Sequence, residues 1–151
     1  MTYPTLQASL DPTAPYGHRN YWRSACLPAL DDAAIEWIAA RCLELPTPHS
    51  MIHVHQLGGA IARGSLSNAA GPLRNYEFIV NTVATWERAR QDDEVVAWAR
   101  RCGDGFTGAA TRRAYVNFSG NDAAREESFA PDVCSRIDEF KRRHDPQSLF
   151  L

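Results

Sequence analysis

Residues 112–151 read RRAYVNFSGNDAAREESFAPDVCSRIDEFKRRHDPQSLFL, and this stretch decides how the rest of the chain is interpreted. Its segment 114–118 is β-prone and alternates in polarity, which predicts a short strand with Tyr115 and Asn117 on one face. Val116 and Phe118 would then lie on the other face. We therefore expect a core strand that presents a tyrosine and an asparagine side by side. That pair suits a binding site, but it does not by itself name a reaction.

The same stretch predicts a helix over residues 131–143, because Val133, Ile137 and Phe140 recur at helical spacing. The helix should end at His144, since the residue before Pro146 is disfavoured in the α region. Residues 149–151 are apolar, so we expect this end of the chain to dock on another surface.

Earlier segments alternate between strand and helix patterns. Residues 1–15 carry three prolines and little periodicity, which predicts an extended N-terminal arm. Strands are expected at 16–27, 50–57, 60–63 and 74–86. Helices are expected at about 31–45 and about 92–103, each capped by an aspartate. The apolar stripe of the first helix would consist of Ile35, Ile38, Cys42 and Leu45. The sequence therefore predicts an α+β fold, in which an antiparallel sheet has helices packed on one face. Residues 16–151 should form one domain.

Composition narrows the class of protein. The chain has 151 residues, a net charge of −2 and a pI near 6.2, which argues against a nucleic-acid or anionic-membrane partner. No stretch is long and apolar enough to span a bilayer, and the first residues do not resemble a signal peptide. The four cysteines lie far apart, which is typical of free thiols in a reducing compartment. We therefore expect a cytoplasmic protein without a metal site.

Histidine and arginine side chains provide further candidate site residues. His53 and His55 would point the same way on a strand, about 7 Å apart. A metal would need a third ligand at matching spacing, and none is evident. Arg63 or Arg74 could bind a carboxylate, although an ordinary surface role is the commoner fate of such arginines.

Several short motifs, taken in order, resemble one enzyme family. They are Tyr-Val-Asn-Phe at 115–118, Phe-Ala-Pro at 129–131, Lys-Arg-Arg-His-Asp-Pro at 141–146 and Leu-Phe at 149–150, preceded by Pro-Tyr-Gly at 15–17, Tyr-Trp-Arg-Ser at 21–24 and Leu-Gly-Gly-Ala-Ile-Ala-Arg at 57–63. The series is similar to the C-terminal, berberine-bridge-enzyme-like segment of FAD-linked oxidases. Ala130, His144 and Ser148 replace the glycine, tyrosine and asparagine that are usual there.

The resemblance implies a substrate-binding domain and assigns roles to the candidate residues. Tyr115 would face flavin and substrate as a base, which requires a neighbouring charge or hydrogen-bond acceptor. Asn117 would orient a substrate carbonyl, and His53 and His55 would line the cleft. A core tyrosine with a bonded hydroxyl and a structural asparagine are equally good interpretations of Tyr115 and Asn117.

In that family a separate domain binds FAD, and nothing in this sequence resembles it. No glycine-rich phosphate-binding segment is evident, so this chain alone should not hold FAD tightly.

Three interpretations remain open. The chain could be the substrate-binding part of an FAD-linked oxidoreductase, completed by an FAD-binding subunit. It could be a stand-alone, non-enzymatic domain that binds a small molecule or assembles as a homo-oligomer. It could also be an α+β domain of another class, such as a dimeric ferredoxin-like monooxygenase. The first two predict an apolar exposed face that a partner or a second copy buries.

Overall fold

A three-stranded antiparallel sheet organises the protein. The structure is a computed structural model that describes residues 1–9, 11–13, 15–63, 72–106, 113–120 and 124–149. Strands β1 (Arg19–Leu27), β2 (Met51–Gln56) and β3 (Phe78–Trp86) pair in the order β1-β3-β2. Every described residue of β3 except the first is buried, as expected for a central strand.

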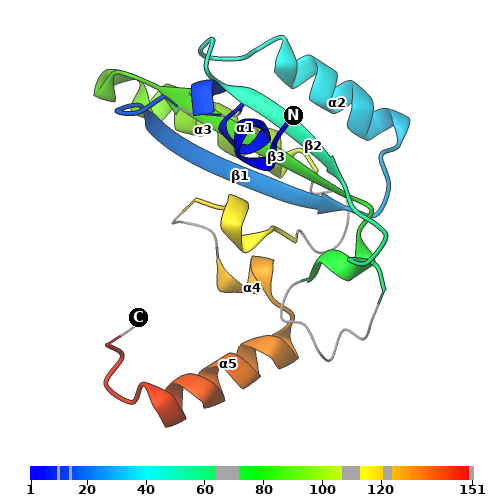
Figure 1. Cartoon of the computed structure of the whole chain (residues 1–151), viewed down its shortest axis with the longest axis vertical. Coiled ribbons are helices and arrows are strands. Elements are labelled where there is room, and N and C mark those ends of the chain that lie inside the picture. The colour runs from blue at the N-terminus through cyan, green and yellow to red at the C-terminus, as the bar shows by residue number, and fades with distance from the viewer. Residues whose placement is uncertain (10, 14, 64–71, 107–112, 121–123, 150–151) are drawn as a thin grey trace.

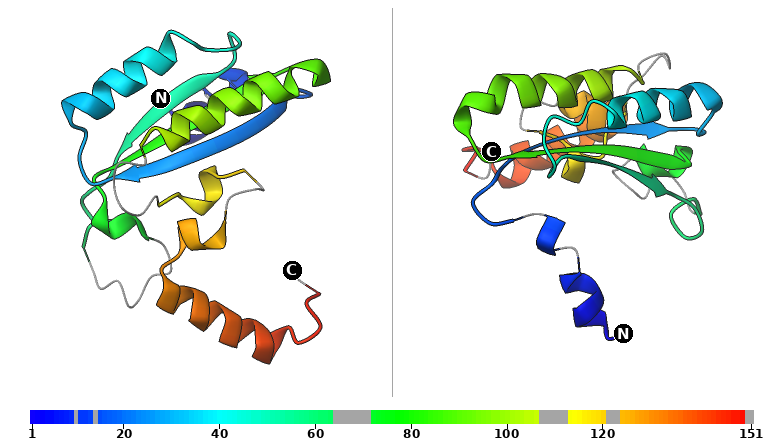
Figure 2. Two further views of the ribbon diagram at one scale, coloured as in Figure 1. Left: turned by 180° about the vertical axis from the view of Figure 1, so that it is seen from behind. Right: turned by 90° about the horizontal axis from the view of Figure 1, so that it is seen from above.

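One face of the sheet carries two helices, α2 (Asp32–Cys42) and α3 (Asp92–Asp104). Both lie on the same side of the strands (Figure 2). The core beneath α3 joins apolar side chains of β3 and of the helix: Ala84, Trp86, Val95, Trp98, Ala99 and Cys102. The predicted α+β architecture, with helices on one face of an antiparallel sheet, is confirmed.

The opposite face, which we call the site face, carries no long helix among the described residues. Strand alternation and the pairing register assign its side chains. They are Asn20, Trp22, Ser24 and Cys26 of β1, Ile79, Asn81, Val83 and Thr85 of β3, and Met51, His53 and His55 of β2.

The predicted strand at 114–118 is wrong. Residues 113–115 run beside β1 without joining the sheet, and residues Val116–Phe118 form a 3-10 turn. The Tyr115 amide donates to the hydroxyl of Ser24 at 3.0 Å, so a side chain replaces the ladder bond that a strand would need. The Phe118 amide donates to the Tyr115 carbonyl at 2.8 Å, and this closes the turn. Phe118 therefore lies on the same side as Tyr115, not opposite to it.

The N-terminal segment is helical rather than extended. Helix α1 (Tyr3–Ala8) begins after Thr2, whose hydroxyl accepts from the Thr5 amide, and a 3-10 turn follows at Asp11–Thr13. Pro4 does not disrupt the helix, because a first-turn residue needs no amide donor. The helix projects from the side of the sheet opposite α2 and α3 (Figure 2), and none of its residues is buried. The division into an arm and one domain remains a prediction.

The expected extended segment at 60–63 is a turn. Gly59 has a φ of +54°, which is left-handed, and the Ile61 amide donates to the Gly58 carbonyl at 3.0 Å. The backbone therefore reverses here instead of continuing β2. A 3-10 turn at Pro72–Asn75 leads into β3, which begins later than the sequence suggested.

The two helices on the sheet differ in detail from the prediction. Ile35, Leu45 and Cys42 are exposed, and α2 contacts α3 instead through Trp37, whose Nε1 donates to the Cys102 carbonyl at 3.2 Å. Helix α3 has no side-chain cap. A 3-10 turn at Ala89–Gln91 precedes it, and Asp92 accepts from Trp86 Nε1 at 2.7 Å instead of capping the helix.

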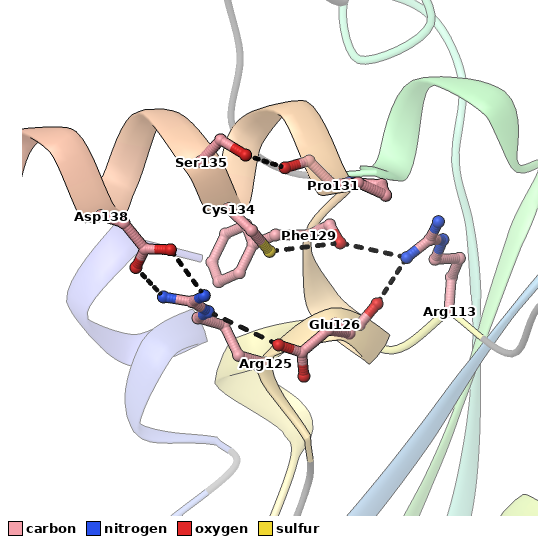
Figure 3. A network of polar contacts seen from close by, with 8 residues as sticks. All are labelled: Arg113, Arg125, Glu126, Phe129, Pro131, Cys134, Ser135 and Asp138. Carbon is pink, nitrogen blue, oxygen red and sulfur yellow. Dashed lines mark hydrogen bonds and ion pairs between the residues drawn. The ribbon is translucent and has the colours of Figure 1, made fainter.

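The C-terminal part consists of α4 (Arg125–Ser128) and α5 (Pro131–His144), and α5 extends away from the sheet (Figure 1). The predicted helix and its end at His144 are confirmed. Arg125 of α4 pairs with Asp138 of α5 through both carboxylate oxygens (Figure 3). Val133 and Cys134 are the buried residues of α5, whereas Phe140 is 65% exposed. Leu149 is also exposed, so it does not dock on this chain as expected; residues 150–151 lie outside the described part.

Candidate functional site

Aromatic and imidazole rings gather around Phe118 on the site face. Its ring centroid lies 5.0 Å from that of Tyr115, 5.3 Å from that of His55 and 5.7 Å from that of Trp22. These spacings are those of packed aromatic pairs. Phe118 was not among the predicted site residues, because strand alternation placed it on the wrong face.

Tyr115 and Asn117 meet as predicted, although by a turn and not by a strand. The Asn117 side-chain amide donates to the Tyr115 hydroxyl at 2.8 Å. The Tyr115 backbone is also fixed, since its carbonyl accepts hydrogen bonds from the Ser24 hydroxyl at 3.4 Å and from the Ser119 hydroxyl at 2.9 Å. An amide donor aimed at a phenol oxygen stabilises negative charge there and leaves the phenol proton available to a second acceptor. Whether Tyr115 and Asn117 act on a substrate stays a prediction.

His53 and His55 also point to the same face, with ring centroids 5.8 Å apart. Loss of hydration next to the sheet, and secondarily the charge of His55, lowers the pKa of His53 below its ordinary value. His55 contacts Phe118 and so joins the cluster. His53 lies beside it, with Nε2 2.8 Å from the Met51 sulfur.

Two buried polar atoms of the site face lack a hydrogen-bond partner among the described residues. They are Oδ1 of Asn81, a side chain that is 1% exposed, and Nε2 of His55. In the register of the sheet, Asn81 lies opposite Ser24 of β1 and opposite His53 of β2. An unpaired buried acceptor costs about 1–3 kcal/mol, so its presence in a central strand needs a reason.

A surface cavity of about 440 Å³ adjoins the cluster. Asn117 and Trp22 line it together with Asn20, Tyr21, Val96, Arg100, Ser119 and Gly120. Its volume is within the range of small-molecule sites. Asn117 therefore borders both the Tyr115 hydroxyl and a cavity that could hold a ligand.

The arginines do not join this cluster by any described contact. Arg63 lies in the turn after β2, and its carbonyl accepts a hydrogen bond from the Arg74 guanidinium. Arg74 also donates to the Ile61 carbonyl at 3.0 Å, so it holds the turn together. The substrate-binding role predicted for Arg63 is untested.

The cysteines are free thiols, and three of the four are buried. Burial raises the pKa of Cys26 to about 12 and that of Cys102 to about 11, so neither forms a thiolate at neutral pH. These two residues therefore serve packing.

The fold matches one part of a known enzyme structure. The matched protein is GilR, described as an oxidoreductase that catalyses the terminal step of gilvocarcin biosynthesis, in a crystal structure with pregilvocarcin. The TM-score is 0.72 at 21% sequence identity, over 86% of this chain and 31% of GilR. This chain thus spans about a third of the length of that protein. No family model and no curated protein sequence matches the chain. The likeness establishes a shared fold with part of an oxidoreductase.

None of the helices in the described part of the chain has the length and apolar character needed to cross a membrane.

Proposed function

We propose that this chain is the substrate-binding domain or subunit of an FAD-linked oxidoreductase, which a separate FAD-binding domain completes. The observation that carries the proposal is the fold match to less than a third of an oxidoreductase, together with a sheet whose helices cover only one face. In this proposal the flavin lies against the site face, and the substrate lies between the flavin and the Tyr115–Asn117 pair. The sequence resemblance to berberine-bridge-like oxidases supports the same assignment.

The residues of the cluster would have distinct roles. Tyr115 would accept a substrate proton, with Asn117 holding its hydroxyl at 2.8 Å. His55 and Phe118 would form the wall of the cleft, since their rings pack at 5.3 Å.

The FAD itself would be held mainly by the partner. A flavin pyrophosphate needs clustered backbone amides or a helix N-terminus, and the cluster offers side chains and rings instead. The chain alone should therefore show no saturable FAD binding at micromolar concentrations in a fluorescence anisotropy titration. Tight binding of FAD by the isolated chain would contradict the split arrangement.

A partner complex can be tested with a matched pair of variants. The tagged chain, purified from its native source, should retain a second polypeptide and the absorption spectrum of a flavin. Val116 and Ile35 are each 48% exposed, one next to Tyr115 and one on α2. Val116→Arg should release the flavoprotein, because a charge would be buried at the contact, whereas Ile35→Arg should not. If both variants retained the flavoprotein equally, the site face would not be part of the interface.

Once a complex is in hand, Tyr115→Phe tests the proposed base. It should lower kcat by about 10²–10⁴-fold, the usual contribution of a general base, with an unchanged flavin content. The control is Tyr16→Phe, at a fully exposed tyrosine before β1. An unchanged kcat in Tyr115→Phe would show that the tyrosine is a packing residue.

A second candidate function is a stand-alone, non-enzymatic domain that binds a small molecule or self-associates. The cavity of about 440 Å³ beside Asn117 favours it, because a small molecule could bind there without any flavin. A stable homo-oligomer by sedimentation, with no flavoprotein in the native complex, would favour this candidate over the first.

A further inference from the structure

We propose that His18, His49 and Glu87 form a binding site for one divalent transition-metal ion, best suited to Zn²⁺. Each side chain offers one ligand atom, and the three atoms all lie within 4.8 Å of one another. No other group of three or more possible ligands occurs among the residues that the structure describes. The site is separate from the Tyr115 cluster and does not depend on the proposed oxidoreductase function.

The sheet register explains why these three residues meet. β1 begins at Arg19, opposite Trp86 at the end of β3, and β2 begins at Met51, opposite Val83. Continuing each ladder by one or two residues places His18 opposite Glu87 and His49 diagonally across from it. By this register all three continue the alternation of the site face. They lie beyond the end of the sheet where β1 and β2 begin, and Figure 1 shows that end of the two strands.

Local hydrogen bonds hold the segment that carries His49. The Thr47 hydroxyl donates to the Thr85 carbonyl at 2.5 Å, and the Thr85 amide donates to the Ser50 hydroxyl at 3.2 Å. Ser50 and Thr85 are both buried. The segment before β2 is therefore tied to the end of β3, beside Glu87.

His18 is positioned by a turn. Gly17 has a φ of +85°, a left-handed conformation that suits glycine, and the His18 amide donates to the Pro15 carbonyl at 3.4 Å. The imidazole lies against His49 with 4.8 Å between the ring centroids, and its Nε2 lies 3.7 Å from a Glu87 oxygen. Its buried Nδ1 has no hydrogen-bond partner among the described residues.

The ligand set and geometry select the ion. Two imidazoles and one carboxylate form a known three-residue set for Zn²⁺, in which a water or another small ligand takes the fourth position. Ligand bonds of about 2.0–2.1 Å place tetrahedral donors about 3.3 Å apart, so movements of about 1 Å would close the site. His18 Nε2 and the Glu87 oxygen, 3.7 Å apart, are already close to that separation. Nitrogen ligands disfavour Mg²⁺ and Ca²⁺, which prefer oxygen.

The neighbouring cation, Arg19, is already bound by another carboxylate: its Nε lies 2.7 Å from Oδ1 of Asp92. The Glu87 carboxylate is therefore left available to a metal ion. The Glu87 side chain is 61% exposed while that of His18 is 15% exposed, so the site is open on the carboxylate side. An ion could therefore enter from solvent without any change in the sheet.

The test is a competition titration of the chelator-treated chain with Zn²⁺ against a chromophoric chelator. One ion per chain is expected, and excess Mg²⁺ should not displace it. Loss of an outer-shell partner already costs about 10–100-fold in affinity, so His18→Ala, His49→Ala and Glu87→Gln should each cost at least about 100-fold. Zn²⁺ should also raise the unfolding midpoint of the wild-type chain but not of these variants.

The chain supplies its own controls. His53→Ala/His55→Ala removes the other close pair of imidazoles, and Cys42→Ser removes the exposed thiol; both should bind Zn²⁺ like the wild type. Glu87→Gln changes an exposed side chain and keeps its size, so it should fold normally. The proposal is overturned if the wild-type chain binds no stoichiometric Zn²⁺. It is equally overturned if either control variant loses the ion while the three site variants keep it.

Discussion

At the scale of single residues, Asn81 is a fully buried side chain whose environment does not fit a purely structural role. It lies in the central strand, is 1% exposed and has an Oδ1 without a partner among the described residues. Replacing an unsatisfied buried polar group by an apolar one of similar size is neutral or stabilising. A residue that served only for packing would not carry the free-energy cost of an unpaired buried oxygen.

Asn81→Leu should therefore raise the free energy of unfolding by about 1–2 kcal/mol, measured by urea denaturation. Thr85 is the control, since it is equally buried on the same face but its hydroxyl donates to Asn20 Oδ1 at 2.8 Å. Thr85→Val breaks that bond and should destabilise the fold by about 1 kcal/mol or more. A marked loss of stability in Asn81→Leu would show that the amide has a structural partner.

His53 makes the stability of the fold depend on pH. Desolvation, and then the charge of His55, lowers its pKa in the folded state. The unfolded chain therefore takes up a proton more readily. The stability from neutral His53 is fully present above about pH 6.5, the unfolded-state pKa, and is lost progressively as the pH falls from there through the lower pKa of the folded state. An NMR titration should find His53 titrating below the ordinary histidine value.

The two causes of that shift can be separated. His55→Gln should move the His53 midpoint upward without restoring the ordinary value, because desolvation is the larger cause. His144→Gln, at the end of α5, should leave the midpoint where it is. A His53 midpoint at or above the ordinary value in the wild-type chain would contradict the prediction.

At the scale of elements, one hydroxyl holds the segment that carries the candidate site. Ser24 is buried, and its Oγ both accepts from the Tyr115 amide at 3.0 Å and donates to the Tyr115 carbonyl. Ser24→Ala leaves a partly buried amide without its partner and should cost about 1 kcal/mol or more of unfolding free energy. Amide hydrogen exchange should show the loss of protection at Tyr115.

A suitable control for Ser24→Ala is Ser119→Ala, which removes a hydroxyl bonded to the same carbonyl but leaves the amide paired. It should reduce the protection of Tyr115 far less. Equal exchange rates in the two variants would mean that Ser24 does not anchor the segment.

The same segment shows where sequence patterns succeed and where they fail. The strands at β1, β2 and β3 and the helices α2, α3 and α5 follow from local alternation and helical spacing, so they were predictable. Residues 114–118 alternate equally well, yet the strand does not form, because the deciding contact comes from Ser24, far away in the sequence. Local pattern carries no information about such a partner.

The candidate sites differ in the same way. Tyr115 and Asn117 are near neighbours in sequence, so a local prediction brought them together even with the wrong conformation. His18, His49 and Glu87 lie in three separate segments, and only the register β1-β3-β2 makes them neighbours. No ligand spacing in the sequence could indicate this trio. α1 was missed for a further reason, since Pro4 looks like a helix breaker unless it is placed in the first turn.

At the scale of the whole molecule, the two faces of the sheet are unequally covered by helices. One face of the sheet is buried by α2 and α3, while α1 and the outer part of α5 extend from the body (Figures 1 and 2). Large apolar side chains remain exposed on these extensions, among them Tyr3, Leu6 and Phe140. Exposed apolar groups on projecting elements are typical of surfaces that bind another subunit.

The outer part of α5 should therefore be dispensable for folding but not for association. Its buried residues, Val133 and Cys134, and its ion pair from Asp138 to Arg125 all lie in the first part of the helix. Removing residues 140–151 should change the free energy of unfolding by less than about 1 kcal/mol, because it deletes mainly surface contacts.

Removing residues 131–151 provides the matched comparison for this truncation. It also deletes the buried side chains Val133 and Cys134, so it should cost about 2 kcal/mol or more. Urea denaturation measures both effects, and affinity purification then reports whether the shorter truncation still retains a partner. If the chain without residues 140–151 unfolds, α5 belongs to the folded core. If it folds and keeps every partner, Phe140 and its neighbours are not part of an interface.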